Sequence, residues 1–325
     1  MSTASPVSDN PISDNRMSDN LMPDNRMSDN LMSDDPSGRA RLARTPAAEF
    51  RHWLRLFFSE LRIVYRRPRN MAMLAVLASA PIFLGIVLKI NTPPPGAGGG
   101  SGAGEFIGQV AENGVFLSLL AMFVLMTLVL PLSVAVVSGD SVAGEAGLGT
   151  LRTLLTVPAG RVRLLLTKYL MIVVFCFSAC LLVAAVGLIM GAILFPIGPV
   201  TLLSGETVPL IDGLGRLAMI VAYVSIGLAA LGAIGIALST FTSHAIGVMA
   251  AILVVVVASE ILDAVSQVAV IHPYLPTHFW LTFDALLRTP IAWSDVWHGL
   301  ASFAVYAVIF CALAVIRIRR ANVTC

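Results

Sequence analysis

Polar residues of the kinds that bind ligands or take part in reactions gather between positions 139 and 168, where the chain reads GDSVAGEAGLGTLRTLLTVPAGRVRLLLTK. The part from Gly144 to Thr150 superficially resembles a phosphate-binding loop. Such a loop needs a lysine after its last glycine to reach the phosphates, and here Thr150 follows Gly149 instead. We therefore expect that this chain itself binds neither ATP nor Mg²⁺.

The residue patterns of hydrolases are missing as well. The sequence contains neither His-Glu-x-x-His nor Gly-x-Ser-x-Gly, so metalloprotease and serine hydrolase chemistry lack their residues. His272 and His278 flank a proline-rich turn and could bind a metal, but the sequence offers no third ligand nearby, which favours interfacial hydrogen bonding. We expect a protein that is not an enzyme and holds no metal.

Two acidic residues, Glu260 and Asp263, fall near the end of an apolar stretch. A carboxylate within a membrane span is costly and commonly functional. Pairing with Arg216 or Arg288, or extension toward the interface, would satisfy both carboxylates, whereas proton coupling would use them directly. The structural role is favoured, and proton coupling stays open.

The composition places these residues in a membrane protein. Of 325 residues, 57% are hydrophobic and 12% are charged, and the mean hydropathy is +0.86. Soluble domains carry about 25% charged residues. The four cysteines form neither a disulfide framework nor a zinc-type spacing. We expect a lipid bilayer around the chain and no nucleic-acid partner.

Six apolar runs, each near the roughly 20 residues that cross a bilayer, predict transmembrane helices at 71–90, 115–138, 169–194, 217–240, 245–263 and 300–316. Eighteen of the 21 Lys and Arg residues lie before the first run, between the second and third, or after the sixth. The positive-inside rule then predicts a multi-pass protein of the cytoplasmic membrane, with both termini and segment 139–168 in the cytoplasm.

The region before the first run divides into two parts. Residues 1–46 include a repeated SDNxx unit that suits neither helix nor strand, so we expect a disordered tail, either dispensable or used for docking; its methionines leave the start position open. Residues 47–70 predict an amphipathic helix bounded by Pro46 and Pro68, which would lie in the membrane interface. Its apolar face holds Phe50, Trp53, Leu54, Phe57, Phe58 and Leu61.

The remaining residues, 71–325, are predicted to form one all-α, six-span domain. Its polar groups at mid-depth are hydroxyls, at Ser118, Thr127, Ser133, Ser178 and Ser225, and Gly227, Gly232 and Gly235 allow close helix packing. A pathway for ions or sugars needs charges or convergent amides. Segment 266–299 is rich in aromatic residues and prolines, which favours short helices at the outer interface.

Within segment 139–168 the residues follow a definite order. An acidic, glycine-punctuated start leads to a short amphipathic helix at 150–155, which Pro158 and Gly160 end before the basic residues of the next span. This order resembles the coupling loop of type-2 ABC exporter permeases. The matching residues are Glu145, Gly149, Thr150, Leu151, Leu154, Leu155, Pro158, Arg161 and Lys168. The family usually carries further charge after the glutamate, where this chain has Ala146 and Gly147.

The resemblance implies a permease half with a connecting helix at 47–70 and a re-entrant pair of short outer helices in 266–299. It also implies a dimer with a second copy or paralogue, and a separate cytoplasmic ATPase subunit that carries ATP and Mg²⁺ and docks on loop 139–168. With its apolar interior, the exporter would carry a drug-like molecule or a lipid. A proton-coupled or facilitative carrier without an ATPase is the alternative, and a membrane scaffold is a third. The substrate, the kind of dimer and the direction of transport stay open.

Overall fold

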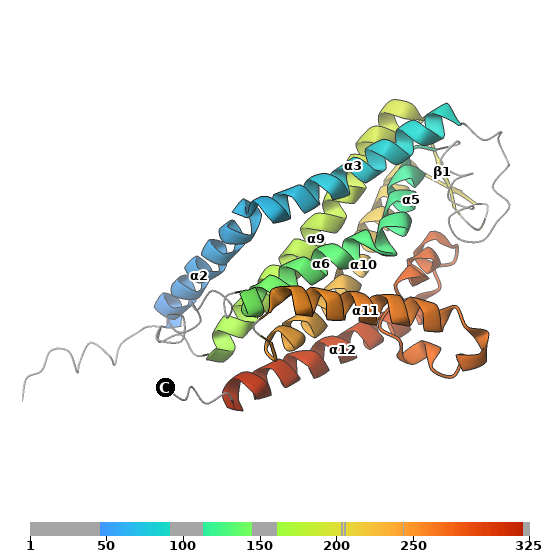
Figure 1. The fold of residues 1–325 in the computed structure, drawn as a ribbon. Helices are drawn as coiled ribbons and strands as arrows, with labels where there is room; N and C mark the ends of the chain where they lie inside the picture. The colour runs from blue at the N-terminus through green and yellow to red at the C-terminus, as the bar shows by residue number, and fades with distance from the viewer. Residues whose placement is uncertain are drawn as a thin grey trace, which may run out of the picture. The chain divides into compact units, whose positions relative to one another are not determined.

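The computed structural model describes residues 46–91, 113–144, 161–202, 204, 206–242 and 244–320. The chain divides into two compact units, Met1–His52 and Trp53–Cys325. Of the first unit the structure describes only the start of a helix, so the predicted tail of residues 1–46 lies outside the described residues except for Pro46. The second unit is a bundle of helices (Figure 1).

Five helices of this bundle are long and apolar enough to cross a membrane: α3 (Pro68–Ile90), α9 (Arg161–Leu194), α10 (Leu210–Ser239), α11 (Ala245–Asp263) and α12 (Trp293–Arg320). The shorter helices α5 (Val115–Met126) and α6 (Val129–Gly139) meet the same criterion together and make a sixth span if this bent pair counts as one. The chain is therefore an all-α, multi-pass membrane protein. Four spans are longer than predicted, because α3 begins at Pro68, α9 at Arg161, α10 at Leu210 and α12 at Trp293.

α2 (Pro46–Arg66) and α3 follow each other along the chain with a break at Arg67 (Figure 1). Arg67 has an extended ψ of 122°, because the ring of Pro68 disfavours the helical conformation in the residue before it. Pro68 then starts α3, where its missing N–H removes no helical hydrogen bond. The predicted helix 47–70 therefore ends at Arg66, and positions 68–70 belong to the first span.

The second predicted run, 115–138, is a broken span and not one straight helix. α5 ends at Met126 and α6 begins at Val129, with 57° between the two parts. The cause is Pro131, which has no N–H for the carbonyl of Thr127 and whose ring crowds the preceding turn. After α6 the chain makes a π-helical turn, Asp140–Gly144, just before residues 145–160.

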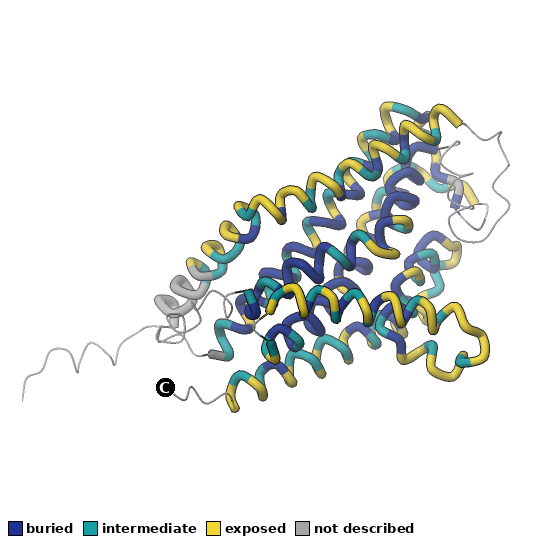
Figure 2. The backbone as a smooth tube through the Cα atoms, viewed as in Figure 1, coloured by how far each residue is buried: buried dark blue, intermediate teal, exposed yellow. Residues whose placement is uncertain are grey.

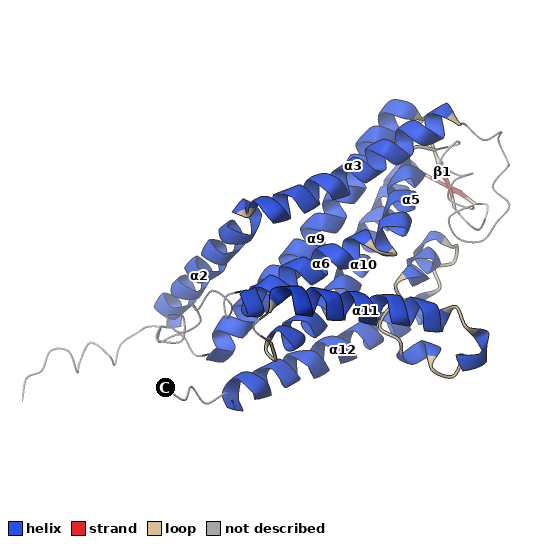
Figure 3. Cartoon of the chain, in the orientation of Figure 1, coloured by secondary structure: helices blue, strands red, loops and turns tan. Residues whose placement is uncertain are grey.

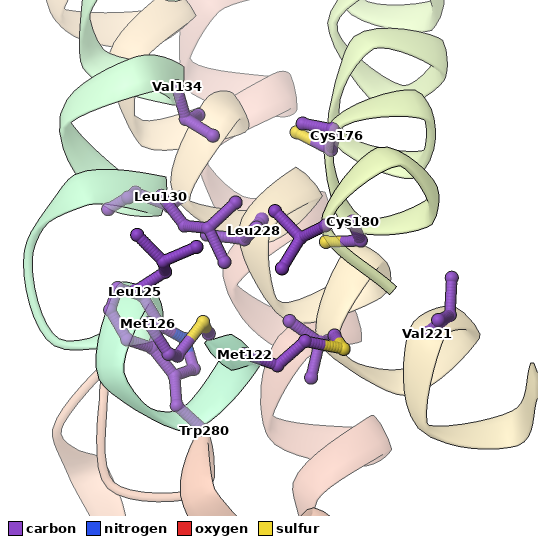
Figure 4. Close-up of a cluster of buried hydrophobic side chains, with 14 of the residues drawn as sticks. Met122, Leu125, Met126, Leu130, Val134, Cys176, Cys180, Val221, Leu228 and Trp280 are labelled. Atoms are coloured by element: carbon purple, nitrogen blue, oxygen red, sulfur yellow. The ribbon is translucent and has the colours of Figure 1, made fainter. Parts of the chain in front are cut away.

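α10 is the most buried of the five single-helix spans and packs against α6, α9 and α12. Figure 2 shows that the interior helices are largely buried, whereas the outer surfaces of α3 and α12 are exposed. Figure 4 shows part of the core, in which Met126, Leu130, Cys180 and Leu228 belong to one apolar cluster. The bundle is thus held by apolar contact between helices from both halves of the chain.

Two helix contacts depend on glycine. A Cβ on Gly232 of α10 would lie 2.6 Å from Ile172 Cγ2 of α9, so only glycine allows this approach, and the predicted packing role of Gly232 is confirmed. A Cβ on Gly191 of α9 would overlap the backbone of Gly114 at the start of α5. The two backbones therefore touch directly at that point.

The bundle has two ends, which we call the loop end and the far end. At the loop end α6 leads toward residues 145–160, α9 follows them, and Gly139 lies close to the carbonyl of Ala245 at the start of α11. At the far end β1 (Val200–Thr201) pairs antiparallel with β2 (Thr207–Val208). Also at the far end, three 3₁₀ turns, Ser266–Val268, His272–Tyr274 and Leu281–Leu287, connect α11 to α12 (Figure 3).

Candidate functional site

Most residues of the predicted coupling loop lie outside the described residues, namely Glu145, Gly149, Thr150, Leu151, Leu154, Leu155 and Pro158. Arg161 is the first residue of α9, and its side chain is likewise outside the described part. The structure does describe the residues on both sides of this loop, from Asp140 to Gly144 and from Val162 onward. The candidate site is built from these two loop ends and from the helices that hold them.

The predicted apolar face of α2 is divided in the structure. Phe50 and Trp53 lie on α2, but their side chains are outside the described part, and Leu54 is half-buried. Phe57 and Leu61, one turn apart, pack against the apolar core. Phe58 is 61% exposed, because the next residue of a helix points about 100° away. One stripe of α2 therefore holds the helix to the bundle and leaves Phe58 on the outside.

Asp140, at the start of the π-helical turn, joins the first loop end to the first span. Its Oδ2 accepts a hydrogen bond from Arg67 Nη1 at 3.4 Å and forms a second ion pair with Arg69. Both guanidinium groups are partly exposed, and solvent limits the value of such pairs to about 1 kcal/mol or less each. Their main effect is geometric, since they fix the start of the loop beside the α2–α3 break.

Lys168, on the third turn of α9, joins the second loop end to α2. Its side chain is 3% exposed, and Nζ lies 3.8 Å from Glu60 Oε2. A buried ammonium needs a carboxylate nearby, because desolvation alone costs several kcal/mol. The sequence pointed to Lys168 but not to Glu60. The available signal was an acid between Arg55 and Arg62 on a helix with a largely basic polar face.

Tyr65 adds a second contact between α2 and α9. Its hydroxyl is hydrogen-bonded to Ser178 Oγ, and its ring lies 6.4 Å from that of Phe175. Ser178 donates its own proton to the carbonyl of Phe175, so Tyr65 is the donor in this pair. Burial raises the pKa of Tyr65 above its ordinary value, and the bond to Ser178 opposes that shift. Tyr65 therefore stays neutral and keeps its proton for this bond.

The mid-depth hydroxyls are largely engaged with backbone carbonyls. Ser118 bonds the carbonyl of Ala184 at 3.0 Å, and Ser133, Ser178 and Ser225 each bond a carbonyl three or four residues earlier. Thr127 differs, because it is exposed at the break between α5 and α6. Non-helical backbone at membrane depth is tolerated where protein covers it or where it lines a water-filled space.

An apolar groove of about 500 Å³ lies between α9, α10 and α12. Aromatic side chains of Tyr169, Phe177 and Phe303 and the small residues Ala222 and Ala304 contribute to its lining. Pockets that hold small molecules typically measure about 300–1,000 Å³. The groove can therefore accept an apolar group of ligand size, and it offers no charged side chain to bind an ion.

At the far end the predicted partners of Asp263 and Glu260 are different from those observed. Asp263 lies 2.6 Å from His278 Nδ1 and not beside Arg216 or Arg288. Arg216 instead donates to the carbonyls of Leu286 and Arg288, at 2.7 and 2.9 Å. The expected pairing fails because the 3₁₀ turns after α11 fold back and bring the histidines to the carboxylate. Figure 3 shows these turns at the end of α11.

The predicted interfacial hydrogen bonding of His272 and His278 is observed in part. His272 Nε2 lies 3.2 Å from the carbonyl of Val265, and its Nδ1 lies 3.8 Å from Asp263 Oδ1. Among the described residues, no three His, Cys, Asp or Glu side chains are arranged to hold a metal ion.

The fold is that of a multi-pass, all-α membrane protein. Ion pairs of Asp140 and Lys168 hold the residues on both sides of segment 145–160. The family model for "Protein of unknown function (DUF2705)" matches residues 105–324. The chain therefore belongs to this family, and the match covers every described span except α3. No curated protein matches the sequence.

Proposed function

We propose that this chain is the transmembrane permease subunit of an ATP-driven ABC exporter. In this proposal, a separate cytoplasmic ATPase subunit docks on loop 145–160 and supplies ATP and Mg²⁺, and a second copy or paralogue completes the permease. The spans number six with the bent pair α5–α6 counted as one, and segment 266–292 acts as a re-entrant outer element. Both termini and the loop lie in the cytoplasm.

One observation supports this function best. Asp140 and Lys168, on either side of the loop, are each ion-paired to the α2–α3 segment. A force on the loop would therefore reach α2, α3, α6 and α9 together. ATP-driven transport requires that movement of the docking element be passed on to the spans.

The substrate proposed is hydrophobic or amphipathic, such as a drug-like molecule or a lipid. The mid-depth serines are bonded to backbone carbonyls, so they offer few donors to a polar cargo. The broken span supports a transport role, because interrupted helices commonly line substrate sites in transporters. Stimulation of ATP hydrolysis by lipophilic compounds, but not by sugars or ions, would test this class in the reconstituted complex.

Substitution in the loop tests the docking function. Leu151→Asp or Leu154→Asp puts a charge on the apolar face of the predicted loop helix, which would cost a few kcal/mol in an apolar contact. We expect the ATPase to be lost from pull-downs while the variant still inserts. Thr153→Asp is the matched control, since it adds the same charge on the other face. Retention of a co-purifying ATPase by both leucine variants would exclude this docking site.

Accessibility labelling tests the orientation. His244 at the loop end and Ser294 at the far end are both exposed, so each can carry a cysteine in a Cys325→Ser background. An impermeant thiol reagent added outside intact cells should label Ser294→Cys, and His244→Cys only after the membrane is opened. Labelling of both positions from outside would contradict the topology.

The carrier alternative has one observation in its favour, the contact between Asp263 and His278. These groups can exchange protons, and they lie at the far end of a span. Proton-coupled transport would stop when a protonophore collapses the gradient and would continue when ATP is depleted. The ABC proposal predicts the opposite response to each treatment.

A further inference from the structure

A small polar recess lies at the loop end between α2, α3, the π-helical turn and α9. It has a volume of about 20 Å³, and its polar lining comprises Glu60, Arg67, Asn70, Asp140, Ser141 and Lys168. A water molecule needs roughly 10–15 Å³ measured with a water-sized sphere. The recess therefore has room for one water and not for a larger ligand.

Asn70, in the first turn of α3, lines this recess and carries a buried acceptor. The residue is 3% exposed, and its Nδ2 donates to the carbonyl of Val64 at 3.0 Å. Its Oδ1 has no hydrogen-bond partner among the described residues. Buried side-chain oxygens nearly always have a partner, from the protein or from ordered water.

The ion pair beside Asn70 is too long for a direct hydrogen bond. Lys168 Nζ and Glu60 Oε2 are 3.8 Å apart, whereas a charge-assisted bond between such groups is about 2.7–2.9 Å long. Polar groups separated by more than about 3.5 Å are often joined by a water. Both residues line the same recess as Asn70.

The charges around the recess indicate what kind of guest it takes. Glu60 and Asp140 oppose Arg67 and Lys168, so the formal charges of these four lining groups cancel. A cation would meet two positive groups, and an anion would meet two carboxylates and the Asn70 oxygen. A neutral guest that both donates and accepts hydrogen bonds suits this lining, and water has that property.

We propose that the recess holds one ordered water, which donates to Asn70 Oδ1 and Glu60 and accepts from Lys168. The water completes a polar network that, with the Asp140 pairs, ties both ends of loop 145–160 to α2 and α3. Glu60 and Asn70 thereby become positioning residues for the loop. This inference holds whether or not the loop binds an ATPase.

The energetic coupling between Glu60 and Lys168 provides the test. Unfolding constants of the full-length chain in mixed detergent are measured for Glu60→Gln, Lys168→Gln and the double variant. The same cycle is then repeated with Asn70→Leu, which removes the acceptor and fills the recess. We expect a coupling of about tenfold in the native background and about twofold or less with Asn70→Leu. An unchanged coupling would mean a direct ion pair and would overturn the proposal.

Two further variants make the result specific. Asn91→Leu is the matched control, because Asn91 Nδ2 also donates to a backbone carbonyl, that of Val87 at 2.9 Å, but at the other end of α3. It should leave the coupling unchanged. Ser141→Val fills the recess from the opposite wall and should lower the coupling as Asn70→Leu does. If Asn70→Leu does not fold, Ser141→Val decides alone, and a native coupling in that variant refutes the water.

Discussion

The loop end and the far end of the bundle are both rich in polar contacts, but they are held in different ways. At the loop end, charged side chains pair across elements, as Arg67 with Asp140 and Lys168 with Glu60. The far end also has contacts between ionisable side chains, Asp263 with His278 and Arg288 with Asp284. There, however, donors from α10 and α12 also bind backbone carbonyls of the segment between α11 and α12. Tyr223 donates to Phe279 and Tyr306 to Tyr274.

This difference indicates how each end can respond. A partly exposed ion pair, such as Arg67 with Asp140, depends on salt, on neighbouring charges and on small displacements, so the contacts at the loop end are the easier ones to rearrange. A backbone carbonyl that accepts a hydrogen bond from a neutral hydroxyl or from Arg216 is fixed in position. The carbonyl carries no formal charge, so dissolved ions do not compete for it. We therefore expect the far end to be the better fixed of the two ends and the loop end to be the easier one to change.

Charge reversal at the loop end should have the largest effect. Glu60→Lys leaves two ammonium groups close together, one of them nearly buried, and should lower the free energy of unfolding by on the order of 3 kcal/mol or more. The exchanged pair Glu60→Lys with Lys168→Glu should recover at least half of this loss, measured by unfolding in mixed micelles. A double variant as unstable as the single one would mean that the pair does not hold α2 to α9.

At the far end, Arg216→Ala should have the next largest effect. It removes two charged hydrogen bonds to the carbonyls of Leu286 and Arg288, and we expect a loss of about 2 kcal/mol. Arg288→Ala is the control, because its exposed pair with Asp284 four residues away is worth about 0.5 kcal/mol or less. Equal losses in thermal unfolding would mean that the hydrogen bonds from Arg216 to the two carbonyls stabilise the far end no more than the exposed pair of Arg288 with Asp284.

Between the two ends, Pro131→Ala should straighten the second span. Alanine supplies the missing N–H to the Thr127 carbonyl, with a change of about 1 kcal/mol or less in stability. Amide exchange at positions 127–132 should slow, and spin-label distances between α5 and α6 should lengthen. Pro81→Ala is the control, since α3 continues through its proline without a break. An unchanged distance would show that packing, and not Pro131, causes the bend.

The smallest effect is expected for Asp140→Asn. Its partners Arg67 and Arg69 are partly exposed, so the loss should be about 1 kcal/mol or less and should shrink further as salt is raised. The loss caused by Arg216→Ala should not depend on salt to the same degree. Parallel salt titrations of the two variants by thermal unfolding give the comparison. Equal salt sensitivity would contradict the proposed difference between the ends.

The parts of the fold that were predicted correctly from sequence are those set by local patterns. Apolar runs located a helix at each predicted span, and α11 has the predicted bounds, 245–263. Pro46 and Pro68 predicted where α2 begins and ends, because proline acts on its immediate neighbours. The break at Thr127 could have been predicted by the same reasoning, since Pro131 lies within the second apolar run of the sequence.

Contacts between distant elements were not predicted. The pairing of Lys168 with Glu60, and of Asp263 with His278, depends on how helices and turns pack, which local periodicity does not encode. Arg216 was expected to neutralise an acid, but the fold gives it two carbonyls instead. The coupling-loop residues from Glu145 to Pro158 lie outside the described residues, so their role stays a prediction.

The length of α9 and its contact with α5 have a mechanical consequence. The backbones of Gly191 and Gly114 touch, so we consider a tilt of α9 about this point of contact. Arg161, at the loop end of the same helix, lies about 45 Å from it at 1.5 Å per residue. A tilt of about 5° around this contact would move the loop end of α9 by roughly 4 Å over the distance of about 45 Å. A small tilt of α9 about this contact would therefore produce a displacement of atomic size beside the loop.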